Sequence, residues 1–452
     1  MHRVVFYASN SKRREKGSNC LSFPSWASQW EAVAGRHPDV EIVLVLQLNG
    51  RYYLDIKDGE LLRKPTHVRL QVLPMEAQLT DFVEAVAALA PDLAVAMPGP
   101  VSGYDWNGIR DAAIAEGLRM RGIETLCYST ETAMDCFDKW RTHQVLKQHG
   151  FRIPEALYLN YALFSSEKYN DTSTGNVYRE YILWEVEKRE MPVVIKSTTG
   201  SASVGIFIAR TKEEARQFLL SDALHEDVLI EEFLNGEEFG AEIHGDAGHY
   251  TVSAPFRIFS AQKGAINDPL GASTIKYGPI LDEALHVPEI MAELKRMADV
   301  MGFSGIVEVD LMLVKGVWYI LEVNNRWSGI TNLVTASQGR YPYDVYVEEA
   351  EDVLTEKAPA DERTAPVYAC QFQMKEASEE VLAAFAAEEK VNSVLEYAVH
   401  LPGEEPFVFL NTVIAGFASL EEMTEGFAEL QRKYPEHISS EQVEALREKA
   451  LC

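Results

Sequence analysis

Residues 305–331, which read GIVEVDLMLVKGVWYILEVNNRWSGIT, constrain the fold more than any other stretch of the chain. Two apolar runs rich in β-branched residues flank a Lys-Gly pair suited to a tight turn, so the stretch predicts a β-hairpin. Asp310 lies in the first predicted strand, while Glu322 and Asn324 end the second, where a spacing of two residues places both side chains on one face. Arg326 follows directly. The polar end of the hairpin therefore gathers carboxylates, an amide and a guanidinium.

These side chains offer hard oxygen ligands beside a cation, a combination that suits Mg²⁺ bound together with a phosphate group. An ordinary amphipathic hairpin with its polar face in solvent is the alternative interpretation. The apolar run at 317–321 precedes the polar residues, which places them at the rim of a buried region and favours a site. The other motifs of the chain distinguish the two interpretations.

Composition excludes several classes of protein. The chain has 452 residues, enough for roughly two to four domains, and its net charge of -27 opposes binding to nucleic acid or to an anionic membrane. Its five cysteines are scattered without metal-ligand or redox spacing, which predicts free thiols in a reducing cytoplasm. The N-terminus reads as a short strand rather than a signal peptide, and no apolar run is long enough to span a membrane. We therefore expect a cytoplasmic protein.

Residues 1–128 alternate between strand and helix patterns, which predicts a parallel sheet covered by helices on both sides. A Gly- and Pro-containing loop at 98–108 follows the third strand, at the edge where open α/β sheets bind ligands. A plain turn is the alternative for this loop. The predicted strands are 3–8, 41–46, 93–97 and 122–126, and the predicted helices are 78–89 and 108–121.

The next region carries two lysines and a loop of small residues. A helix is predicted over 131–149, with Lys139 in mid-course. A buried strand ends at Lys196 and runs into the Ser- and Gly-rich residues 197–206. Such a loop suits phosphate groups, because small residues let backbone N–H groups come close, and a hairpin turn is the alternative.

Acidic residues then mark two further predicted strands. Glu231 and Glu232 lie in a strand over 228–234, and Glu238 follows an Asn-Gly turn at the start of a strand over 239–244.

Three further elements lead from these strands to the hairpin. Residues 252–259 predict a strand that pairs with the preceding one in antiparallel fashion and carries Arg257. Residues 262–277, which include Lys276, have the composition of an active-site flap or of a plain long loop. An amphipathic helix over 288–301 follows.

The C-terminal part of the chain carries no motif that indicates chemistry. A helix over 342–354 is followed by a charged, Pro-bearing linker at 356–366. Residues 367–452 predict a small α+β domain. Its predicted strands are 368–374 and 407–415, and its predicted helices are 378–387, 420–434 and 440–451.

Taken in order, these motifs resemble the ATP-grasp superfamily over about residues 1–350. The segments that carry the resemblance are Asp138-Lys139, Val194-Ile195-Lys196, the loop 199–205, Glu231-Glu232-Phe233-Leu234 with Glu238, Asp310, and Glu322-Val323-Asn324-Asn325-Arg326. The end of the hairpin and the extra C-terminal region look most like the carboxylate–amine ligases, in the L-amino-acid ligase and biotin-carboxylase-like branch. The resemblance implies an α/β (α+β) ATP-grasp fold. Its implied parts are an N-terminal α/β domain at 1–128, an ATP-grasp domain at 129–355 with a mobile lid at about 190–238, and a C-terminal α+β domain at 367–452.

The resemblance also implies a nucleotide site. Lys139 and Lys196 would hold the phosphates of ATP. The small-residue loop would close over these phosphates, and the strand end would bind the adenine and the ribose. The residues so implied are Ser201, Ala202, Ser203, Val204, Gly205, Glu231, Glu232, Phe233, Leu234 and Glu238.

The metal and catalytic roles come from the same resemblance. Asp310, Glu322 and Asn324 would bind two Mg²⁺ ions, or Mn²⁺ in their place, with Glu322 bridging. Arg326 is the first candidate to stabilise the transferred phosphoryl group and the oxyanion of a tetrahedral intermediate, and Arg257 is the second.

One position departs from the family pattern. D-alanine:D-alanine ligases have an arginine where this chain has Glu308, and a carboxylate cannot stabilise an oxyanion. Glu308 is open to three interpretations: a residue that binds a substrate ammonium group, a third metal ligand or a plain strand residue.

His244 is a candidate base. The alternative is a strand histidine whose hydrogen bonds are made within the protein. Trp327 is expected to shape a pocket wall, and Lys276 is a further candidate for substrate contact.

The implied activity is ATP-dependent formation of an amide or peptide bond. ATP would convert a carboxylate to an acyl-phosphate, which an amine would attack with release of phosphate. The expected partners are therefore a small carboxylic acid and an amine, with neither nucleic acid nor membrane, and a homodimer is common in the resembling families. An ATP-grasp carboxylase or phosphotransferase is one alternative, and a nucleotide-binding regulatory protein without turnover is another.

Overall fold

The computed structural model describes residues 1–10, 16–47, 52–99, 106–171, 175–200, 205–246, 248–261, 274–355, 367–400 and 407–451. No helix in these ranges is both long and apolar enough to cross a lipid bilayer.

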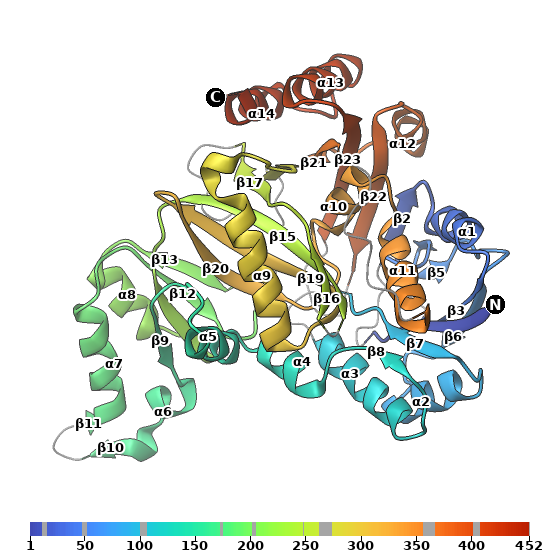
Figure 1. The fold of residues 1–452 in the computed structure, drawn as a ribbon. Helices are drawn as coiled ribbons and strands as arrows, with labels where there is room; N and C mark the ends of the chain where they lie inside the picture. Colours follow the sequence, from blue (N-terminus) through green and yellow to red (C-terminus); the bar gives the residue numbers. More distant parts are fainter. Residues whose placement is uncertain are drawn as a thin grey trace.

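The N-terminal region forms a five-stranded parallel sheet in the order β6-β3-β1-β7-β8 (Figure 1). Its central strands are buried on both faces, because helices and the neighbouring sheet cover them. The parallel sheet predicted from the alternating pattern is therefore confirmed, although α1 and β6 lie outside the predicted elements. The elements are β1 (His2–Ala8), α1 (Trp26–Arg36), β3 (Val40–Gln47), β6 (Arg69–Leu73), α2 (Leu79–Ala87), β7 (Leu93–Ala96), α3 (Trp106–Arg119) and β8 (Thr125–Leu126).

The long helix predicted over 131–149 is wrong, because two helices occupy this stretch. Helix α4 (Thr130–Phe137) ends at Asp138, and α5 (Lys139–Gln148) begins directly after it. The Asp138 side chain accepts hydrogen bonds from the backbone N–H groups of Trp140 and Arg141, and so caps the second helix. Lys139 therefore lies at the start of a helix rather than in its middle.

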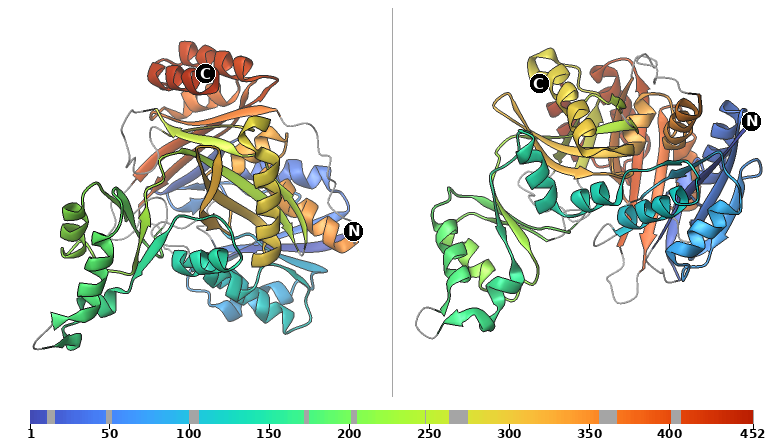
Figure 2. Two further views of the ribbon diagram at one scale, coloured as in Figure 1. Left: turned by 60° about the vertical axis from the view of Figure 1, so that its left-hand side comes forward. Right: turned by 60° about the horizontal axis from the view of Figure 1, so that its bottom comes forward.

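A smaller unit projects from the body of the molecule, as the green arm in Figure 2 shows. It is a four-stranded antiparallel sheet in the order β13-β12-β14-β9, with helices packed around a separate apolar core. The elements are β9 (Ala156–Leu159), α6 (Tyr161–Ser165), the hairpin β10 (Asn170–Asp171) and β11 (Gly175–Asn176), α7 (Val177–Glu187), β12 (Val193–Ser197), β13 (Ile206–Ala209), α8 (Lys212–Leu219) and β14 (Val228–Glu232).

The body of the molecule is organised by a twelve-stranded sheet in the order β20-β19-β15-β17-β18-β21-β23-β22-β2-β4-β5, with β16 paired to β15. Helix α9 (Val287–Met301) packs its apolar residues against one face of this sheet (Figure 1). The strands nearest the site are β15 (Glu237–Asp246), β16 (His249–Val252), β17 (Phe256–Ser260), β18 (Thr274–Gly278), β19 (Ser304–Val314) and β20 (Val317–Asn324). The strand predicted over 252–259 is thus the end of β16 followed by β17.

The C-terminal strands continue the same sheet. Strand β21 pairs with β18, and β22 pairs with β2 (Asn19–Phe23) from the N-terminal region. The two ends of the chain are therefore joined through one sheet, a pairing between segments far apart in sequence. The remaining elements are β4 (Ile56–Lys57), β5 (Glu60–Leu61), α10 (Thr331–Ser337), α11 (Pro342–Thr355), β21 (Tyr368–Met374), α12 (Glu379–Ala386), β22 (Val391–Val399), β23 (Phe407–Phe417), α13 (Leu420–Lys433) and α14 (Ser440–Leu451).

Candidate active site

The hairpin predicted at 305–331 is formed by β19 and β20. Its turn uses Lys315 at φ 49° and Gly316 at φ 78°, a left-handed pair typical of tight hairpins. Asp310 lies opposite Glu322, and Glu308 lies opposite Asn324. All four side chains therefore start from the same face of the sheet, opposite the face that α9 covers.

An irregularity in the hairpin helps to shape the site. The strand pairing shifts after Asp310, so that Leu311 lies opposite Ile320 and Leu321 is an extra residue in β20. The carbonyl oxygen of Leu321 lies 3.5 Å from the Lys196 Nζ atom. The bulge thus directs a backbone acceptor toward a lysine of the projecting arm.

Lys139 contacts both the hairpin and the small-residue loop. Its Nζ atom lies 3.0 Å from Glu322 Oε1 and also donates a hydrogen bond to the carbonyl of Gly200. The position follows from the broken helix, because the first residue of α5 points back toward the loop. The backbone N–H of Lys139 donates to the carbonyl of Thr198, which fixes the helix start to the loop.

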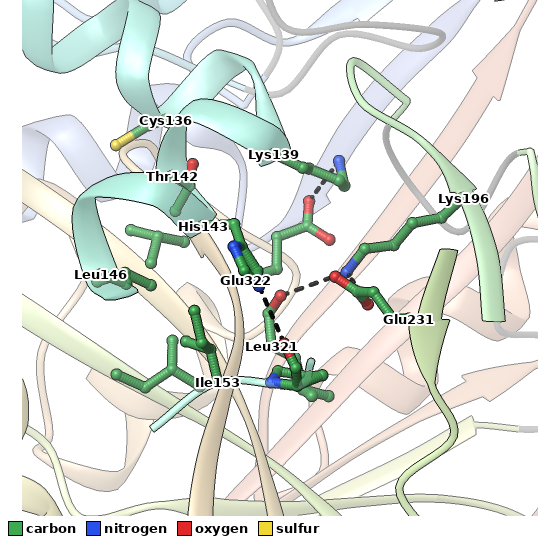
Figure 3. Close-up of a pocket in the computed structure, with 13 residues that line it drawn as sticks. Cys136, Lys139, Thr142, His143, Leu146, Ile153, Lys196, Glu231, Leu321 and Glu322 are labelled. Carbon is green, nitrogen blue, oxygen red and sulfur yellow. Dashed lines mark hydrogen bonds and ion pairs between the residues drawn. The ribbon is translucent and has the colours of Figure 1, made fainter. Parts of the chain in front are cut away.

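Lys196 forms a second, more deeply buried ion pair. Its Nζ atom lies 2.8 Å from Glu231 Oε2, and the two side chains are only 9% and 7% exposed. Figure 3 shows that the two ion pairs, Lys139 with Glu322 and Lys196 with Glu231, lie side by side, and all four residues line one cavity. Two lysines from different elements thus converge on the end of the hairpin.

Attraction between oppositely charged groups shifts the pKa values of Glu322 and Lys196. Burial alone would raise the pKa of Glu322, but attraction to Lys139 and Lys196 outweighs it and lowers that pKa. Burial would lower the pKa of the Lys196 ammonium, but attraction to Glu231 and Glu322 outweighs it and raises that pKa. Lys196 therefore stays protonated and Glu322 stays ionised around neutral pH.

Asp310 is in a different situation. Burial raises its pKa well above the usual value, and repulsion from Glu308 and Glu322 adds to the effect. Burial likewise raises the pKa of Glu308. Within the ranges that the structure describes, neither carboxylate has an ion-pair partner within 4.0 Å. Such a group is stabilised by a cation that comes from outside the chain.

The Asn324 amide lies between the Glu308 carboxylate and the Arg326 guanidinium. Its Nδ2 atom donates to Glu308 Oε2 at 3.2 Å, and its Oδ1 atom accepts from Arg326 Nη2 at 3.1 Å. The Glu308 carboxylate therefore fixes the orientation of the amide, so that the Asn324 oxygen faces Arg326. This orienting contact is a role outside the three interpretations that the sequence leaves open for Glu308.

The hairpin fits a divalent metal by the chemistry of its donors. No three His, Cys, Asp or Glu side chains of the described residues gather closely enough to form a metal site by themselves. The hairpin instead offers the carboxylates of Asp310 and Glu322 with the amide oxygen of Asn324, a set of hard oxygen donors. The excess of acids around Asp310 is what a bound cation would compensate.

Two adjoining cavities lie against these residues. One contains about 340 Å³ of space, part of it open to solvent, and its lining has an apolar end and a charged end. The other contains about 360 Å³, also partly open to solvent, and lies between the start of α3, the end of α4 and the hairpin end. Both cavities are lined by Cys136, Lys139 and Glu322. The two cavities therefore adjoin each other at these three residues.

The other predicted nucleotide residues that the structure describes lie in the projecting arm or just after it, apart from Glu238 in β15. Glu231 lines the first cavity. Glu232 instead accepts a hydrogen bond from the backbone N–H of Glu155, and Phe233 and Leu234 follow β14 in a half-buried stretch. Glu238 lies on the acidic face of β15, and Gly205, at φ 79°, precedes β13. The predicted residues Ser201, Ala202, Ser203 and Val204 lie outside the described residues.

The prediction that Arg257 reaches the site is wrong. Arg257 lies opposite Phe239, on the other face of the sheet. Its guanidinium lies 3.1 Å from Glu237 Oε2 and donates to the hydroxyl of Tyr277 and the carbonyl of Lys449. Strand alternation explains the difference, because Phe239 is one residue away from Glu238 and so points to the opposite face.

Two further candidates are engaged in buried contacts. His244 Nε2 lies 2.9 Å from Glu242 Oε2, with both side chains buried, which matches the alternative of a satisfied strand histidine. The Trp327 ring is fully buried and stacks on Tyr52 at 5.7 Å, so that it packs against the N-terminal region rather than lining either cavity. Lys276 is half-buried in β18, beside Gly329.

Three residues in or near the site have no counterpart in the sequence analysis. His143 lines the first cavity, and burial lowers the pKa of its imidazole. It lies four residues after Lys139 on α5, a spacing that would place both on one helix face. Asn325 lines the second cavity, and its Nδ2 atom is buried without a hydrogen-bond partner. Glu242, four residues after Glu238, is on the same face of β15.

A comparison with known families decides the identity of this core. Residues 136–330 match the family model of the ATP-grasp domain. This part of the chain is an ATP-grasp domain. The match contains both lysines and the whole hairpin, and the α/β fold class predicted for the chain is confirmed.

Relatives and solved structures extend the comparison. The chain is 23% identical over 286 residues to a D-alanine–D-alanine ligase of Coprothermobacter proteolyticus, covering 60% of this chain and 84% of the relative. It is 30% identical over 154 residues to a carbamoyl-phosphate synthase of Methanobrevibacter smithii, covering 34% of this chain and only 40% of the relative.

Two solved structures share the fold over nearly the whole chain. An L-amino acid ligase from Bacillus licheniformis has a TM-score of 0.62 at 17% identity, covering 96% of this chain and 97% of the other. The biotin carboxylase domain of the Hydrogenobacter thermophilus 2-oxoglutarate carboxylase, solved with MgADP, has a TM-score of 0.60 at 12% identity, covering 97% of this chain and 90% of the other. The regions before and after the ATP-grasp domain therefore also have structural counterparts.

Proposed function

We propose that the protein is an ATP-dependent carboxylate–amine ligase, which joins a small carboxylic acid to an amine through an acyl-phosphate and releases ADP and phosphate. The observation that carries the proposal is the convergence of Lys139, Lys196 and Arg326 on Glu322, where all three cations lower the carboxylate's pKa against the effect of burial. Three cations gathered at one point beside unpaired acids are what a polyphosphate with bound metal requires.

In this proposal the chain's own residues bind and align the reactants. Lys139 and Lys196 exchange their carboxylate partners for phosphate oxygens, so that no lysine charge is left without a partner at any stage. Mg²⁺ held by Asp310, Glu322 and Asn324 would screen the charge of the phosphates. The apolar lining of the first cavity, which includes Leu146 and Ile153, accommodates a planar base.

Arg326 has the central catalytic role. Its guanidinium reaches the Asn324 oxygen at 3.1 Å, and so lies at the edge of the metal-binding face. From there it would stabilise the charge on the transferred phosphoryl group and then the oxyanion formed when the amine attacks. The resemblance to ligases in both sequence and fold supports the ligase reaction in which we give Arg326 this role.

The proposal is tested by trapping the activated acid. The protein is incubated with MgATP, hydroxylamine and each of a panel of amino acids and small acids, and hydroxamate is measured beside phosphate release. We expect ATP-dependent hydroxamate with at least one acid, because hydroxylamine attacks an acyl-phosphate as an amine does. Phosphate release with every accepted acid but hydroxamate with none would contradict the proposal, and release that depends on bicarbonate would indicate a carboxylase.

A further inference from the structure

The loop 326–331, which connects the hairpin to α10, is anchored to a buried carboxylate that no motif contains. Glu242, in the middle of β15, is fully buried. Its Oε1 atom accepts hydrogen bonds from Ser328 Oγ at 3.2 Å and from Thr331 Oγ1 at 2.5 Å. Its other oxygen pairs with His244 at 2.9 Å. Both oxygens of this carboxylate are therefore occupied, and two of its partners lie in the loop.

The two hydroxyl groups also organise the loop's own backbone. The N–H of Ser328 donates to Thr331 Oγ1 at 2.9 Å, and the N–H of Ile330 donates to Ser328 Oγ at 3.1 Å. Each hydroxyl thus accepts from the backbone and donates to Glu242. Because a buried N–H without a partner is costly, this network specifies a single loop conformation.

The rest of the molecule holds the same loop from two further sides. From the C-terminal strands, Gln371 Nε2 donates to the carbonyl of Gly329 at 2.8 Å. From the N-terminal region, the carbonyl of Pro98 accepts from the N–H of Trp327 at 3.1 Å, and the Trp327 ring packs among aromatic residues of that region. Segments from all three parts of the chain therefore meet at six residues.

We propose that Glu242 and Gln371 are positioning residues that fix the loop 326–331 and thereby hold Arg326 at the reacting phosphoryl group. The proposal rests on the ligase function proposed above, and it makes the C-terminal strands part of the catalytic unit. The backbone carbonyl of Trp327 accepts from Arg326 Nη1 at 3.3 Å, so that the anchored loop directly supports the guanidinium. Displacing an arginine by about 1 Å is enough to lower a rate by about 100-fold.

The first test replaces one hydroxyl without changing the side-chain shape. In Thr331→Val the N–H of Ser328 and the Glu242 carboxylate lose a partner. Amide hydrogen exchange of residues 326–330 is expected to become at least about 10-fold faster. The turnover rate is expected to fall by about 10- to 100-fold, while MgATP affinity, measured by calorimetry, stays within about twofold. Thr331→Ser keeps the hydroxyl group and is expected to restore both properties.

The matched control lies one helical turn further on. Thr335 is also fully buried in α10, but its hydroxyl donates to the carbonyl of Thr331 and does not contact Glu242. Thr335→Val is therefore expected to leave exchange in the loop and turnover near the unmodified values. Equal effects of the two valine variants would show a general weakening of α10 and overturn the proposal.

The second test addresses the C-terminal strands with a matched pair of glutamines. Gln371 and Gln442 are both buried, and each donates its Nε2 atom to a backbone carbonyl, but the Gln442 acceptor is Gln373, away from the loop. Gln371→Met is expected to accelerate exchange at 326–331 and to lower turnover, whereas Gln442→Met is expected to do neither. Unchanged exchange in Gln371→Met would overturn the role of the C-terminal strands.

The exchange measurements separate this proposal from the function on which it rests. If no acid supports turnover in the unmodified protein, the ligase function fails, yet exchange still reports whether Glu242 and Gln371 fix the loop. If turnover is present and exchange in both test variants is unchanged, the positioning proposal alone fails.

Discussion

The two cross-strand carboxylates of the hairpin, Asp310 and Glu322, differ in what surrounds them. Glu322 faces the lysines of α5 and β12, which lower its pKa although burial acts in the other direction. Asp310 faces the acids of β15 and β19. Burial and repulsion from these acids raise its pKa, although Lys276 acts in the opposite direction. One region of the site is thus already neutralised by the chain, and the other is not. We call them the lysine side and the acidic side.

This difference separates two ways of preparing a site for a charged ligand. On the lysine side, each ammonium group has a carboxylate partner that a phosphate can replace, so the ligand exchanges one ion pair for another. On the acidic side, neighbouring carboxylates repel one another, and the repulsion is relieved when a cation binds. A nucleotide that carries a metal ion suits both sides, because its phosphates can replace the carboxylate partners of the lysines and its metal ion can relieve the repulsion between the acids.

The largest expected effect comes from replacing Glu322, which pairs with Lys139 on the lysine side and is a proposed metal ligand on the acidic side. Glu322→Ala should lower ADP formation by at least about 1,000-fold, because the acidic side loses a metal ligand and the phosphate charge is no longer screened. ADP release is measured with saturating MgATP, and circular dichroism checks the fold. Glu237→Ala is the control, because Glu237 pairs with Arg257 on the opposite face of the sheet. Near-normal turnover in Glu322→Ala would show that the acidic side does not bind the catalytic metal.

A smaller effect is expected on the lysine side. Lys196→Met should weaken MgATP binding by about 10- to 100-fold, as expected for the loss of one charged hydrogen bond. Because Glu231 would remain buried without its partner, the double variant Lys196→Met with Glu231→Gln separates ligand binding from stability. Calorimetric titration with MgATP measures the affinity. The exposed Lys188 of the same arm serves as a control, and equal affinity in Lys196→Met and Lys188→Met would remove Lys196 from the phosphate site.

The sequence predicts these two sides unequally. Glu322 and Asn324 could be placed on one face because a strand alternates with a period of two. Asp310 shares that face only because the bulge at Leu321 shifts the register that the hairpin turn sets. The parallel N-terminal sheet also follows from local alternation of strand and helix patterns. Local sequence is sufficient where the alternation within one strand or a single βα repeat decides the geometry.

Features that depend on a side-chain cap or on distant partners could not be predicted in this way. The break between α4 and α5 depends on the Asp138 side chain capping the second helix, whereas the residue pattern around it is compatible with one continuous helix. The face occupied by Arg257 depends on its register against Phe239, which only the folded sheet defines. Glu242 and Gln371 belong to no motif, and their contacts form between segments 86 and 42 residues apart in sequence.

The difference between paired and unpaired acids recurs outside the site, at two buried aspartates. Asp111 of α3 is fully buried, and burial raises its pKa to about 7 although the backbone N–H of Ser9 donates to it. Asp344 of α11 is also buried, but hydrogen bonds from His37 and Arg36 outweigh burial and lower its pKa. Neither aspartate lines the two cavities of the site. They therefore isolate the effect of pairing from the effect of catalysis.

The smallest predicted effect is a pH-dependent change in stability. Because the pKa of Asp111 is raised by folding, its contribution to stability is fully present below its ordinary pKa near 3.8 and is lost as the pH rises through about 7. Asp111→Asn carries no charge at any pH, so its free energy of unfolding relative to the unmodified protein should improve by on the order of 1–3 kcal/mol between pH 5 and pH 8.5. Urea titrations at the two pH values measure the change. Asp344→Asn should instead be less stable than the unmodified protein at both pH values, because a carboxylate whose pKa is lowered by folding contributes stability above its ordinary pKa. An improvement with rising pH in Asp344→Asn but not in Asp111→Asn would reverse the assignment of paired and unpaired acids.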